Sequence, residues 1–150
     1  LPERHIRKSD SSGKHCLFNS SCCDIDCVES KTCYRSNVLK TSKLIANKLA
    51  LNDYKWMVTF QSRVTIIDRK WLKPFTDIEL MNFPKNNINN IVILCPSFVA
   101  DCLETLEEIN IRERESFFKA GGKKFTYIPC LNNDQNFIEF LEELIIISSK

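Results

Sequence analysis

Residues 91–109 read IVILCPSFVADCLETLEEI. The apolar run 91–95 is typical of a strand whose two faces are both covered by helices. Asp101 then precedes a segment with apolar residues at helical spacing, which predicts a helix that ends near Gly121 and Gly122. A buried strand followed by a helix is the repeating unit of an α/β fold.

The alternation of helices and strands continues on both sides of this stretch. Apolar residues at helical spacing predict a helix within 36–51, and Thr76 starts a second, short helix. The runs 56–60 and 125–128 predict two further strands, and Asp134 precedes a last helix. Strands separated by helices indicate a parallel, Rossmann-like sheet in a three-layer α/β domain with flanking helices.

Polar residues follow each of the three predicted strands, at 61–63, 96–104 and 129–133. In open α/β sheets, ligands bind outside the carboxyl ends of the strands. We therefore expect these polar residues to share one cleft.

The composition is that of an ordinary globular protein. The 150 residues are enough for one domain, and 43% of them are hydrophobic and 27% charged. Because 21 Lys and Arg are nearly balanced by 19 Asp and Glu, for a net charge of +2, we expect no nucleic-acid partner. No apolar run approaches the ~20 residues of a transmembrane helix. The first ten residues, LPERHIRKSD, lack the apolar core of a secretory signal, so we expect a cytoplasmic protein.

The predicted helix after Asp101 begins with an acidic turn. Glu104 and Glu108 are four residues apart and so share one helical face. Two carboxylates that face one site suit a divalent cation or the acceptance of protons. The spacing alone favours a plainer interpretation, a solvated acidic turn that the helix dipole stabilises.

Six blocks of the sequence carry a resemblance to one enzyme family. They stand in the family's order: LPERHIRKSD at 1–10, MVTFQSR at 57–63, WLKPFTD at 71–77, CPSF at 95–98, DCLETL at 101–106 and AGGKKFTYIPCLN at 120–132. The chain resembles the carboxy-terminal half of the ferrochelatases, which insert ferrous iron into a porphyrin. The resemblance covers nearly the whole chain, and it implies a chelatase-like fold and a lyase of haem biosynthesis.

The resemblance also implies roles for particular residues. The family's metal-site glutamate, which faces a histidine across the porphyrin cleft, matches Glu104, and a nearby acidic residue of the same helix matches Glu108. Ferrous iron is then a substrate, and a carboxylate beside the macrocycle either ligates it or takes a pyrrole proton. The porphyrin is protoporphyrin IX or coproporphyrin. Cys102 stands where other members carry histidine.

The histidine of the family's metal site would fall two residues ahead of the LPE block, before Leu1. His5 does not replace it, because it lies inside that block, and we expect His5 at the surface. The chain is therefore expected to insert metal only together with an amino-terminal half. The alternative is a non-catalytic, chelatase-like module that binds an iron–sulfur cluster or zinc. Arg63 either pairs with a porphyrin propionate or makes a structural salt bridge.

A cysteine-rich loop is the second distinctive feature. Residues 9–31 are rich in Ser, Asp, Asn and Cys and show no regular period, which predicts an irregular loop. Five of the eight cysteines lie in this loop or just after it: Cys16, Cys22, Cys23, Cys27 and Cys33. The arrangement resembles ferrochelatases with an internal cluster-binding segment. Four thiolates suit a [2Fe–2S] cluster or a structural zinc.

Four of these cysteines are the expected ligands: Cys16, Cys23, Cys27 and Cys33. Cys22 is the alternative to Cys23, because adjacent cysteines rarely both reach one metal. Unligated thiols are the plainer interpretation. Cys95 and Cys130 end apolar strands, so we expect them to be buried as small hydrophobic residues.

The expected organisation is an amino-terminal segment at 1–35 that contains the cysteine-rich loop, followed by a chelatase-like domain at 36–150. Both belong to a single domain that is itself a fragment of a two-domain enzyme. The resemblance leaves open a peripheral association with membranes and the oligomeric state.

Overall fold

The computed structural model describes most of the chain, namely residues 1–18, 21–25, 27–63 and 70–149. The chain divides into two compact units, Leu1–Asn82 and Phe83–Lys150. The boundary expected between residues 35 and 36 stays a prediction.

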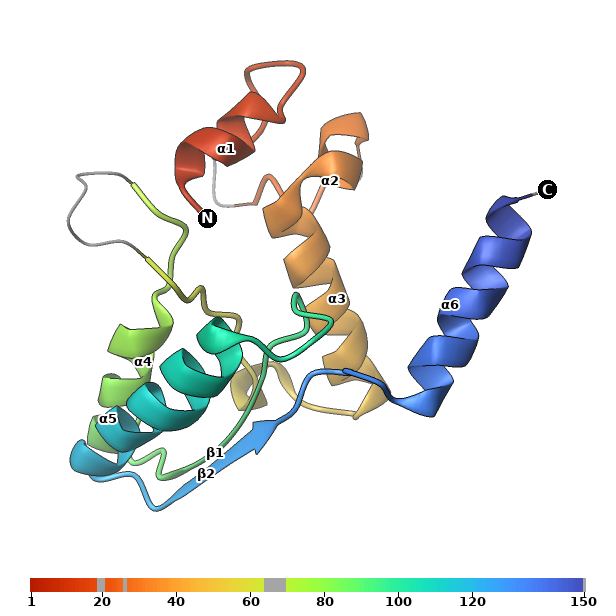
Figure 1. Cartoon of the computed structure of the whole chain (residues 1–150). Coiled ribbons are helices and arrows are strands. Elements are labelled where there is room, and N and C mark those ends of the chain that lie inside the picture. The colour runs from red at the N-terminus through yellow and green to blue at the C-terminus, as the bar shows by residue number, and fades with distance from the viewer. Residues whose placement is uncertain (19–20, 26, 64–69, 150) are drawn as a thin grey trace. The chain divides into compact units, whose positions relative to one another are not determined.

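The first unit is built from short helices around the cysteine-rich loop (Figure 1, red to green). Its helices are α1 (Glu3–Lys8), α2 (Val28–Thr32), α3 (Tyr34–Lys48), the 3₁₀ turn η1 (Asp53–Lys55) and α4 (Thr76–Asn82). The helices expected within 36–51 and after Thr76 are confirmed as α3 and α4. The prediction of an irregular loop is wrong from Val28 onward, where α2 begins.

The strand predicted at 56–60 is wrong, because only Phe60 makes a bridge, and its partner is Phe75. The Phe60 N–H donates to the Pro74 carbonyl over 2.9 Å. The Thr76 N–H donates to the Phe60 carbonyl over 3.1 Å. A longer ladder would need the N–H of residue 74 as a further donor. Pro74 has no N–H, so the pairing does not extend beyond this bridge.

Thiols form part of the apolar core of the first unit. Ile6 of α1 packs with Phe60 and Leu72, and Cys16 and Cys33 complete the same group. All five side chains are at most 8% exposed. A buried thiol behaves as a small hydrophobic group. The cysteine-rich loop is therefore held to α1 by packing.

The second unit alternates strands and helices (Figure 1, green to blue). Its elements are η2 (Pro84–Asn86), β1 (Asn90–Leu94), η3 (Glu104–Glu113), α5 (Arg114–Lys119), β2 (Lys124–Ile128) and α6 (Gln135–Ser148). β1 and β2 pair in parallel, from Asn90 opposite Lys124 to Leu94 opposite Ile128. The predicted α/β class with a parallel sheet is confirmed.

One face of the two-stranded sheet is covered by α5. Phe125 of β2 is 7% exposed, and its ring centroid lies 5.9 Å from that of the fully buried Phe117. Gly122 leaves room for this ring, since a Cβ at that position would stand 2.1 Å from the nearest Phe117 carbon. Side chains alternate along a strand, so Val92 and Leu94 lie on the opposite face. Val92 is 66% exposed and Leu94 is 43% exposed, so these two apolar side chains of the second face remain largely open.

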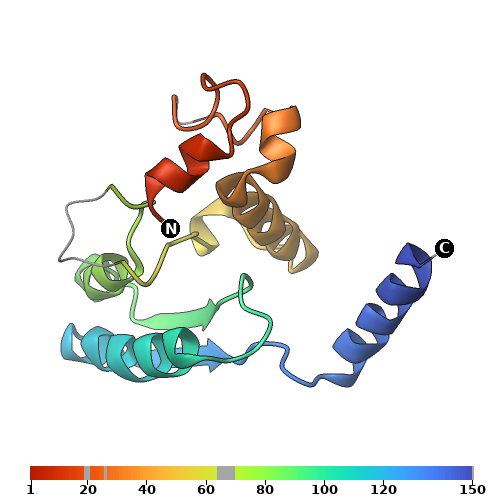
Figure 2. The same cartoon turned by 45° about the horizontal axis from the view of Figure 1, so that its top comes forward.

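α6 has no buried residue, although eight of its 14 residues are apolar. Asp134 caps the helix as predicted, because its carboxylate accepts hydrogen bonds from the Asn136 and Phe137 N–H groups (3.0 and 3.2 Å). Figures 1 and 2 both show α6 extending away from β1 and β2. A helix with a wide apolar surface normally packs that surface against another element.

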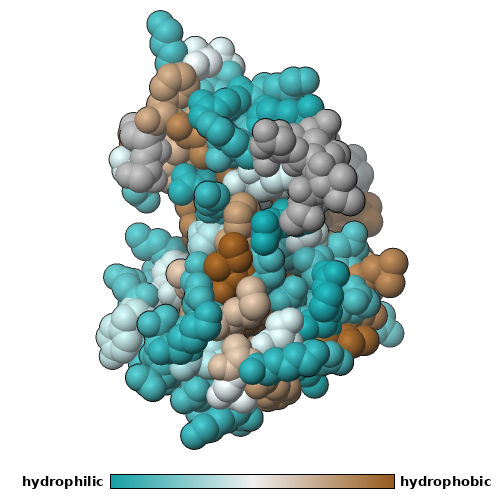
Figure 3. Space-filling model, turned by 90° about the vertical axis from the view of Figure 1, so that its left-hand side faces the viewer, coloured by the Kyte–Doolittle hydropathy of each residue, from teal (hydrophilic) through white to brown (hydrophobic). Residues whose placement is uncertain are grey.

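The side of the molecule drawn in Figure 3 is mainly hydrophilic, with apolar residues in separate areas. Among the described residues, no helix combines the length and the hydropathy that a membrane span requires.

Candidate active site

Glu104 begins η3, after the loop that leaves the carboxyl end of β1. Its side chain is exposed, and a hydrogen bond with the Cys102 side chain lowers the pKa of its carboxyl group. Glu108 is only 15% exposed, and its Oε1 lies 3.8 Å from Nη2 of Arg112. The two carboxylates therefore differ, since Glu104 faces solvent whereas Glu108 has a cation beside it.

The helix that carries these residues is a π-helix, whereas the spacing predicted an α-helix. Its buried stripe continues into α5 and consists of Thr105, Ile109, Glu113 and Phe117. A π-helix closes hydrogen bonds from residue i to residue i+5, and such segments are frequent at functional sites. The sequence carries no separate signal for it, because apolar spacing does not distinguish the two kinds of turn.

Asp101 ties together the loops that follow β1 and β2. Its carboxylate accepts hydrogen bonds from the side chains of Tyr127 (2.5 Å), Asn132 (2.8 Å) and Thr105 (2.9 Å). These bonds, with that from Tyr127 the strongest cause, hold the pKa of the Asp101 carboxyl well below its usual range. Polar residues from 96–104 and 129–133 thus meet at Asp101, whereas a cleft that they share with 61–63 stays a prediction.

The other cysteines of the second unit are half-buried, so the prediction that Cys95 and Cys130 are fully buried is wrong. Burial raises the pKa of the Cys95 thiol to about 12, and burial also raises the pKa of Cys130. The Cys130 Sγ lies 3.8 Å from the Tyr127 hydroxyl. Thiols that stay protonated at neutral pH are poor nucleophiles and poor ligands.

Four loop cysteines form one buried group, which we call the cysteine cluster: Cys16, Cys22, Cys23 and Cys33. The side chains of Cys16 and Cys33 are hydrogen-bonded to each other. The Sγ atoms of Cys22 and Cys23 are 3.9 Å apart. Arg35 of α3 donates from Nη1 to both sulfurs, at 3.1 Å for Cys23 and 3.7 Å for Cys22. The cluster thus includes Cys22, the residue that was only the alternative.

Cys27 is half-buried and stands beside His15, with 3.5 Å between its Sγ and the His15 Nε2. The same nitrogen lies 2.9 Å from the Cys22 carbonyl oxygen. Three of the expected ligands therefore come together, and the fourth makes a contact of its own. In the part of the chain that the structure describes, no three His, Cys, Asp or Glu side chains are placed to hold one metal ion.

Two thiols of the cluster, those of Cys16 and Cys23, resist ionisation. Burial, followed by the neighbouring Cys33, raises the pKa of Cys16 to about 12. Burial raises the pKa of Cys23 to about 11, although the Arg35 guanidinium acts in the opposite direction. Metal ligation requires thiolates, so a metal would have to displace these protons. Cysteine thiolates are ligands that suit a soft metal. Because the described side chains do not converge on one point, the cysteine side chains would have to turn toward a metal in order to bind it.

Asp10 organises the start of the cysteine-rich loop, which the sequence analysis missed. Its carboxylate accepts hydrogen bonds from the N–H groups of Ser12 and Gly13 (both 3.1 Å) and of His15 and Cys16 (both 2.8 Å). A hydrogen bond from the Ser12 hydroxyl is the strongest cause, and together with these backbone bonds it holds the pKa of the Asp10 carboxyl well below its usual range. The available signal was the run Asp-Ser-Ser-Gly, which is typical of a turn.

Arg63 makes a structural salt bridge, one of the two alternatives. Its Nη2 lies 2.6 Å from Oδ2 of Asp77, and its guanidinium carbon lies 4.5 Å from the centre of the Phe75 ring. His5 is exposed, as predicted.

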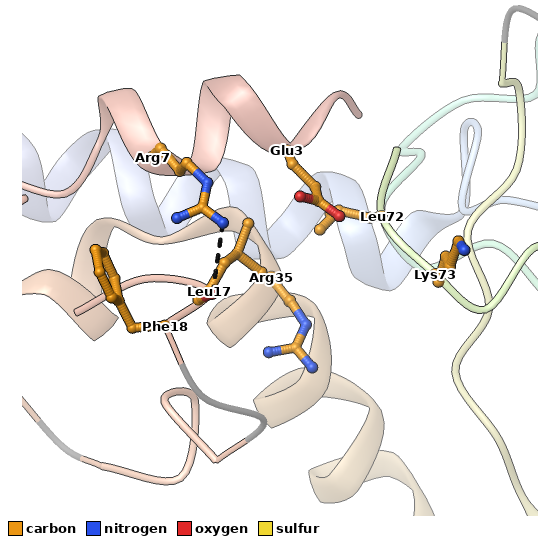
Figure 4. Close-up of a pocket in the computed structure, with 7 residues that line it drawn as sticks. All are labelled: Glu3, Arg7, Leu17, Phe18, Arg35, Leu72 and Lys73. Atoms are coloured by element: carbon orange, nitrogen blue, oxygen red, sulfur yellow. Dashed lines mark hydrogen bonds between the residues drawn. The ribbon is translucent and has the colours of Figure 1, made fainter. Parts of the chain in front are cut away.

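A cavity of about 380 Å³ opens in the first unit. Its lining combines three cations with a carboxylate and apolar side chains: Glu3, Arg7, Leu17, Phe18, Arg35, Leu72 and Lys73. Figure 4 shows that the cations point in different directions, with Arg7 turned toward the Leu17 carbonyl (3.5 Å) and Lys73 on the opposite side from Phe18. The cavity therefore lacks the convergent charges of a prearranged anion site.

The sequence profile of one family, described as ferrochelatase, matches residues 1–148. The chain belongs to the ferrochelatase family. The ferrochelatase of Pseudomonas fluorescens (strain Pf0-1) is 43% identical over 145 residues, which are 96% of this chain and 42% of that protein. The ferrochelatase of Opitutus terrae is 45% identical over 141 residues, which are 94% of this chain and 40% of that protein. The chain thus spans about two-fifths of the length of these ferrochelatases, and the resemblance to a part of the family's sequence is confirmed.

Proposed function

We propose that this chain supplies one wall of a ferrochelatase active site, in which ferrous iron is inserted into a porphyrin. The observation that supports the proposal is the exposed Glu104 carboxylate, which lies beyond the carboxyl end of β1 on a turn anchored by Asp101. That end of a parallel sheet is where α/β folds bind their ligands.

The chemistry of metal insertion suits this carboxylate. A glutamate carboxyl group is already ionised at neutral pH, and the hydrogen bond from the Cys102 side chain lowers the pKa of Glu104 further. Ionised carboxylate oxygens are good ligands for divalent cations. Two pyrrole protons leave the porphyrin as the metal enters, and a carboxylate within hydrogen-bond reach accepts a proton. Glu108 is paired with Arg112, so we assign it a supporting electrostatic role.

We propose that the opposite wall belongs to an amino-terminal half of the kind that the longer relatives contain. The chain covers only 42% of the Pseudomonas fluorescens protein. Two apolar surfaces of the second unit are uncovered, one along α6, where Ile145 is 68% exposed, and one on the sheet at Val92. Exposed apolar surfaces of this kind mark sites of association. The chain alone is therefore expected not to insert metal.

The test joins this chain to the portion of the Pseudomonas fluorescens ferrochelatase that lies outside the match. Anaerobic insertion of Fe²⁺ into protoporphyrin IX and into coproporphyrin, offered separately, is followed by absorbance. Glu104→Gln is expected to lower kcat by about 10²-fold or more. Glu107→Gln, on the same helix and also exposed, is the matched control and should leave kcat unchanged. Equal activity of both variants would remove Glu104 from the metal site.

The buried thiols support a second proposal, the binding of a [2Fe–2S] cluster or a zinc ion by the cysteine-rich loop. Cys16, Cys23 and Cys33 are the proposed ligands that already lie together. The proposed fourth ligand is Cys27 or Cys22. Cys27 would first have to turn away from His15, whereas Cys22 already lies in the cluster. Free thiols persist in a reducing compartment, and we propose a cytoplasmic location on that ground.

Anaerobic purification of the 150-residue chain tests this second proposal. Visible absorbance and acid-labile sulfide report a [2Fe–2S] cluster, and elemental analysis reports zinc. Cys22→Ser and Cys27→Ser, made one at a time, identify the fourth ligand, because only the loss of a ligand releases the metal. Protein that holds neither sulfide nor zinc would leave the thiols as core packing. A metal-loaded chain whose joined form inserts no iron would favour the non-catalytic module.

A further inference from the structure

Tyr127 and Asn132, which have no role in the proposed metal chemistry, form hydrogen bonds with Asp101, three residues before Glu104. The Tyr127 hydroxyl, on β2, donates to Oδ1 of Asp101. Asn132, in the loop after β2, uses both ends of its amide, since its Oδ1 accepts from the Asp101 N–H and its Nδ2 donates to Asp101 Oδ2 (both 2.8 Å). With Thr105 these residues form a group that we call the Asp101 clamp.

Asn132 suits its place through its backbone as well as its side chain. Its φ is +50°, in the left-handed region that Asn tolerates better than most residues, and its N–H donates to the Val99 carbonyl over 2.9 Å. The orientation of its amide is set by Asp101, because a backbone N–H only donates and so must face the amide oxygen. The amide nitrogen then faces the Asp101 carboxylate. An aspartate at this position would place a second carboxylate there.

Thr105 connects the clamp to the first turn of η3. It is fully buried, and its hydroxyl donates to Asp101 Oδ1 and accepts from the Cys102 N–H (both 2.9 Å). The N–H groups of Thr105 and Leu106 both donate to the Cys102 carbonyl (3.1 and 2.8 Å). Glu104 lies within this turn, so the direction of its side chain follows the backbone that the clamp holds.

We propose that Tyr127 and Asn132 are positioning residues for Glu104, which act through Asp101 and hold the first turn of η3. The kinetic consequence rests on the proposed ferrochelatase function, whereas the structural consequence belongs to this chain alone. A misplacement of about 1 Å in a reacting group can lower a rate about 10²-fold. The clamp therefore matters to a carboxylate that must meet a metal inside a rigid macrocycle.

Kinetics of the joined protein test the functional consequence. Asn132→Ala and Tyr127→Phe are expected to lower kcat for metal insertion by about 10-fold to 100-fold and to leave the KM for porphyrin unchanged. Asn133→Ala, an exposed neighbour, is the matched control. In the Asp101→Ala background, Asn132→Ala should cause no further loss, because residues that act through one another are not additive. Wild-type kcat in the single variants, or additive losses in the double variant, would overturn the proposal.

Amide hydrogen exchange of the 150-residue chain tests the clamp without any activity. Asn132→Ala should speed exchange at Thr105 and Leu106 and leave unchanged the amide of Lys124, which donates to the Asn89 carbonyl beside the sheet. Faster exchange at all three positions would indicate general destabilisation and contradict a positioning role, as would unchanged exchange at Thr105. If the joined wild-type protein inserts no metal, the ferrochelatase proposal fails, while this exchange pattern still decides for or against the clamp.

Discussion

The Asp101 clamp and the cysteine cluster bring polar groups together in different ways. In the clamp, the carboxylate is hydrogen-bonded by three side chains that come from different elements. In the cluster, the thiols contact one another and Arg35. Among the described residues, no three His, Cys, Asp or Glu side chains are placed to hold one metal ion. Hydrogen bonds to a carboxylate are strong and directional, whereas a thiol is a weak donor and acceptor.

This difference separates a site whose side chains are held in place before any ligand arrives from one whose side chains are expected to turn toward a ligand. The backbone around the cysteines is itself held, because Asp10 accepts from the N–H groups of His15 and Cys16. What remains adaptable is the direction of the thiols. We therefore expect metal to change the cysteine cluster and to leave the clamp as it is.

The largest expected effect on stability comes from removing the core of the second unit, to which the clamp also belongs. Phe117 is fully buried, with ring centroids 5.9 Å from those of Phe118 and Phe125. Phe117→Ala should lower the free energy of unfolding by about 3–5 kcal/mol, as measured by denaturant unfolding. Phe118→Ala, on the same helix but 43% exposed, should cost much less. Equal losses would show that the buried Phe117 ring does not form the core of the second unit.

Zn²⁺ should stabilise the cysteine cluster by a smaller amount. A metal that binds only the folded chain adds about 2.7 kcal/mol at a free concentration 100 times its Kd. Amide exchange should slow at Cys23 and Cys33 and stay unchanged at Asp101, and a chelator should reverse the effect.

The affinity for Zn²⁺ should also rise with pH through neutrality. The pKa values of Cys16 and Cys23, about 12 and about 11, lie above neutral pH, so these thiols bind protons that the metal must release. Calorimetry in buffers of different ionisation enthalpy measures the proton release. An affinity that falls as the pH rises, or equal protection at Asp101, would contradict the contrast between the two regions.

The smallest effects compare one glycine from each of the two units, Gly122 of the second and Gly13 of the first. Gly122→Ala places a Cβ 2.1 Å from the Phe117 ring and should cost about 1–3 kcal/mol through overpacking. Gly13→Ala, in the loop held by Asp10, meets no atom within 4 Å but has a φ of +64°, so backbone strain should cost about 1 kcal/mol. Thermal unfolding measures both. Recovery of part of the loss when Phe117→Leu is added to Gly122→Ala would identify the overlap as the cause.

The sequence predicted those parts of the fold that depend on apolar spacing and on capping residues. β1, β2, α3, α4 and α6 follow from such patterns, and Asp134 caps α6 as expected. The predicted strand at 56–60 fails because strand pairing depends on partners distant in sequence, and here the partner segment contains Pro74. The π-helix is invisible to apolar spacing, since both kinds of helical turn bury similar patterns.

The candidate site was only partly predictable, for a related reason. Glu104 follows from the family motif, which is a local pattern of residues. The contribution of Asn132 depends on a contact across 31 residues of sequence, and that of Tyr127 on one across 26, which no local pattern encodes. Asp10 was missed although its turn residues are adjacent, because an aspartate before serines and a glycine is common in turns of every kind.

Metal insertion is the most direct test of the account, measured for the 150-residue chain alone and for the chain joined to the portion of the Pseudomonas fluorescens ferrochelatase that lies outside the match. We predict no porphyrin metallation by the chain alone. The joined protein should metallate protoporphyrin IX or coproporphyrin and depend on Glu104. Robust insertion by the chain alone would contradict the view that it forms one wall of a two-sided site. A folded joined protein without activity would contradict the proposed function itself.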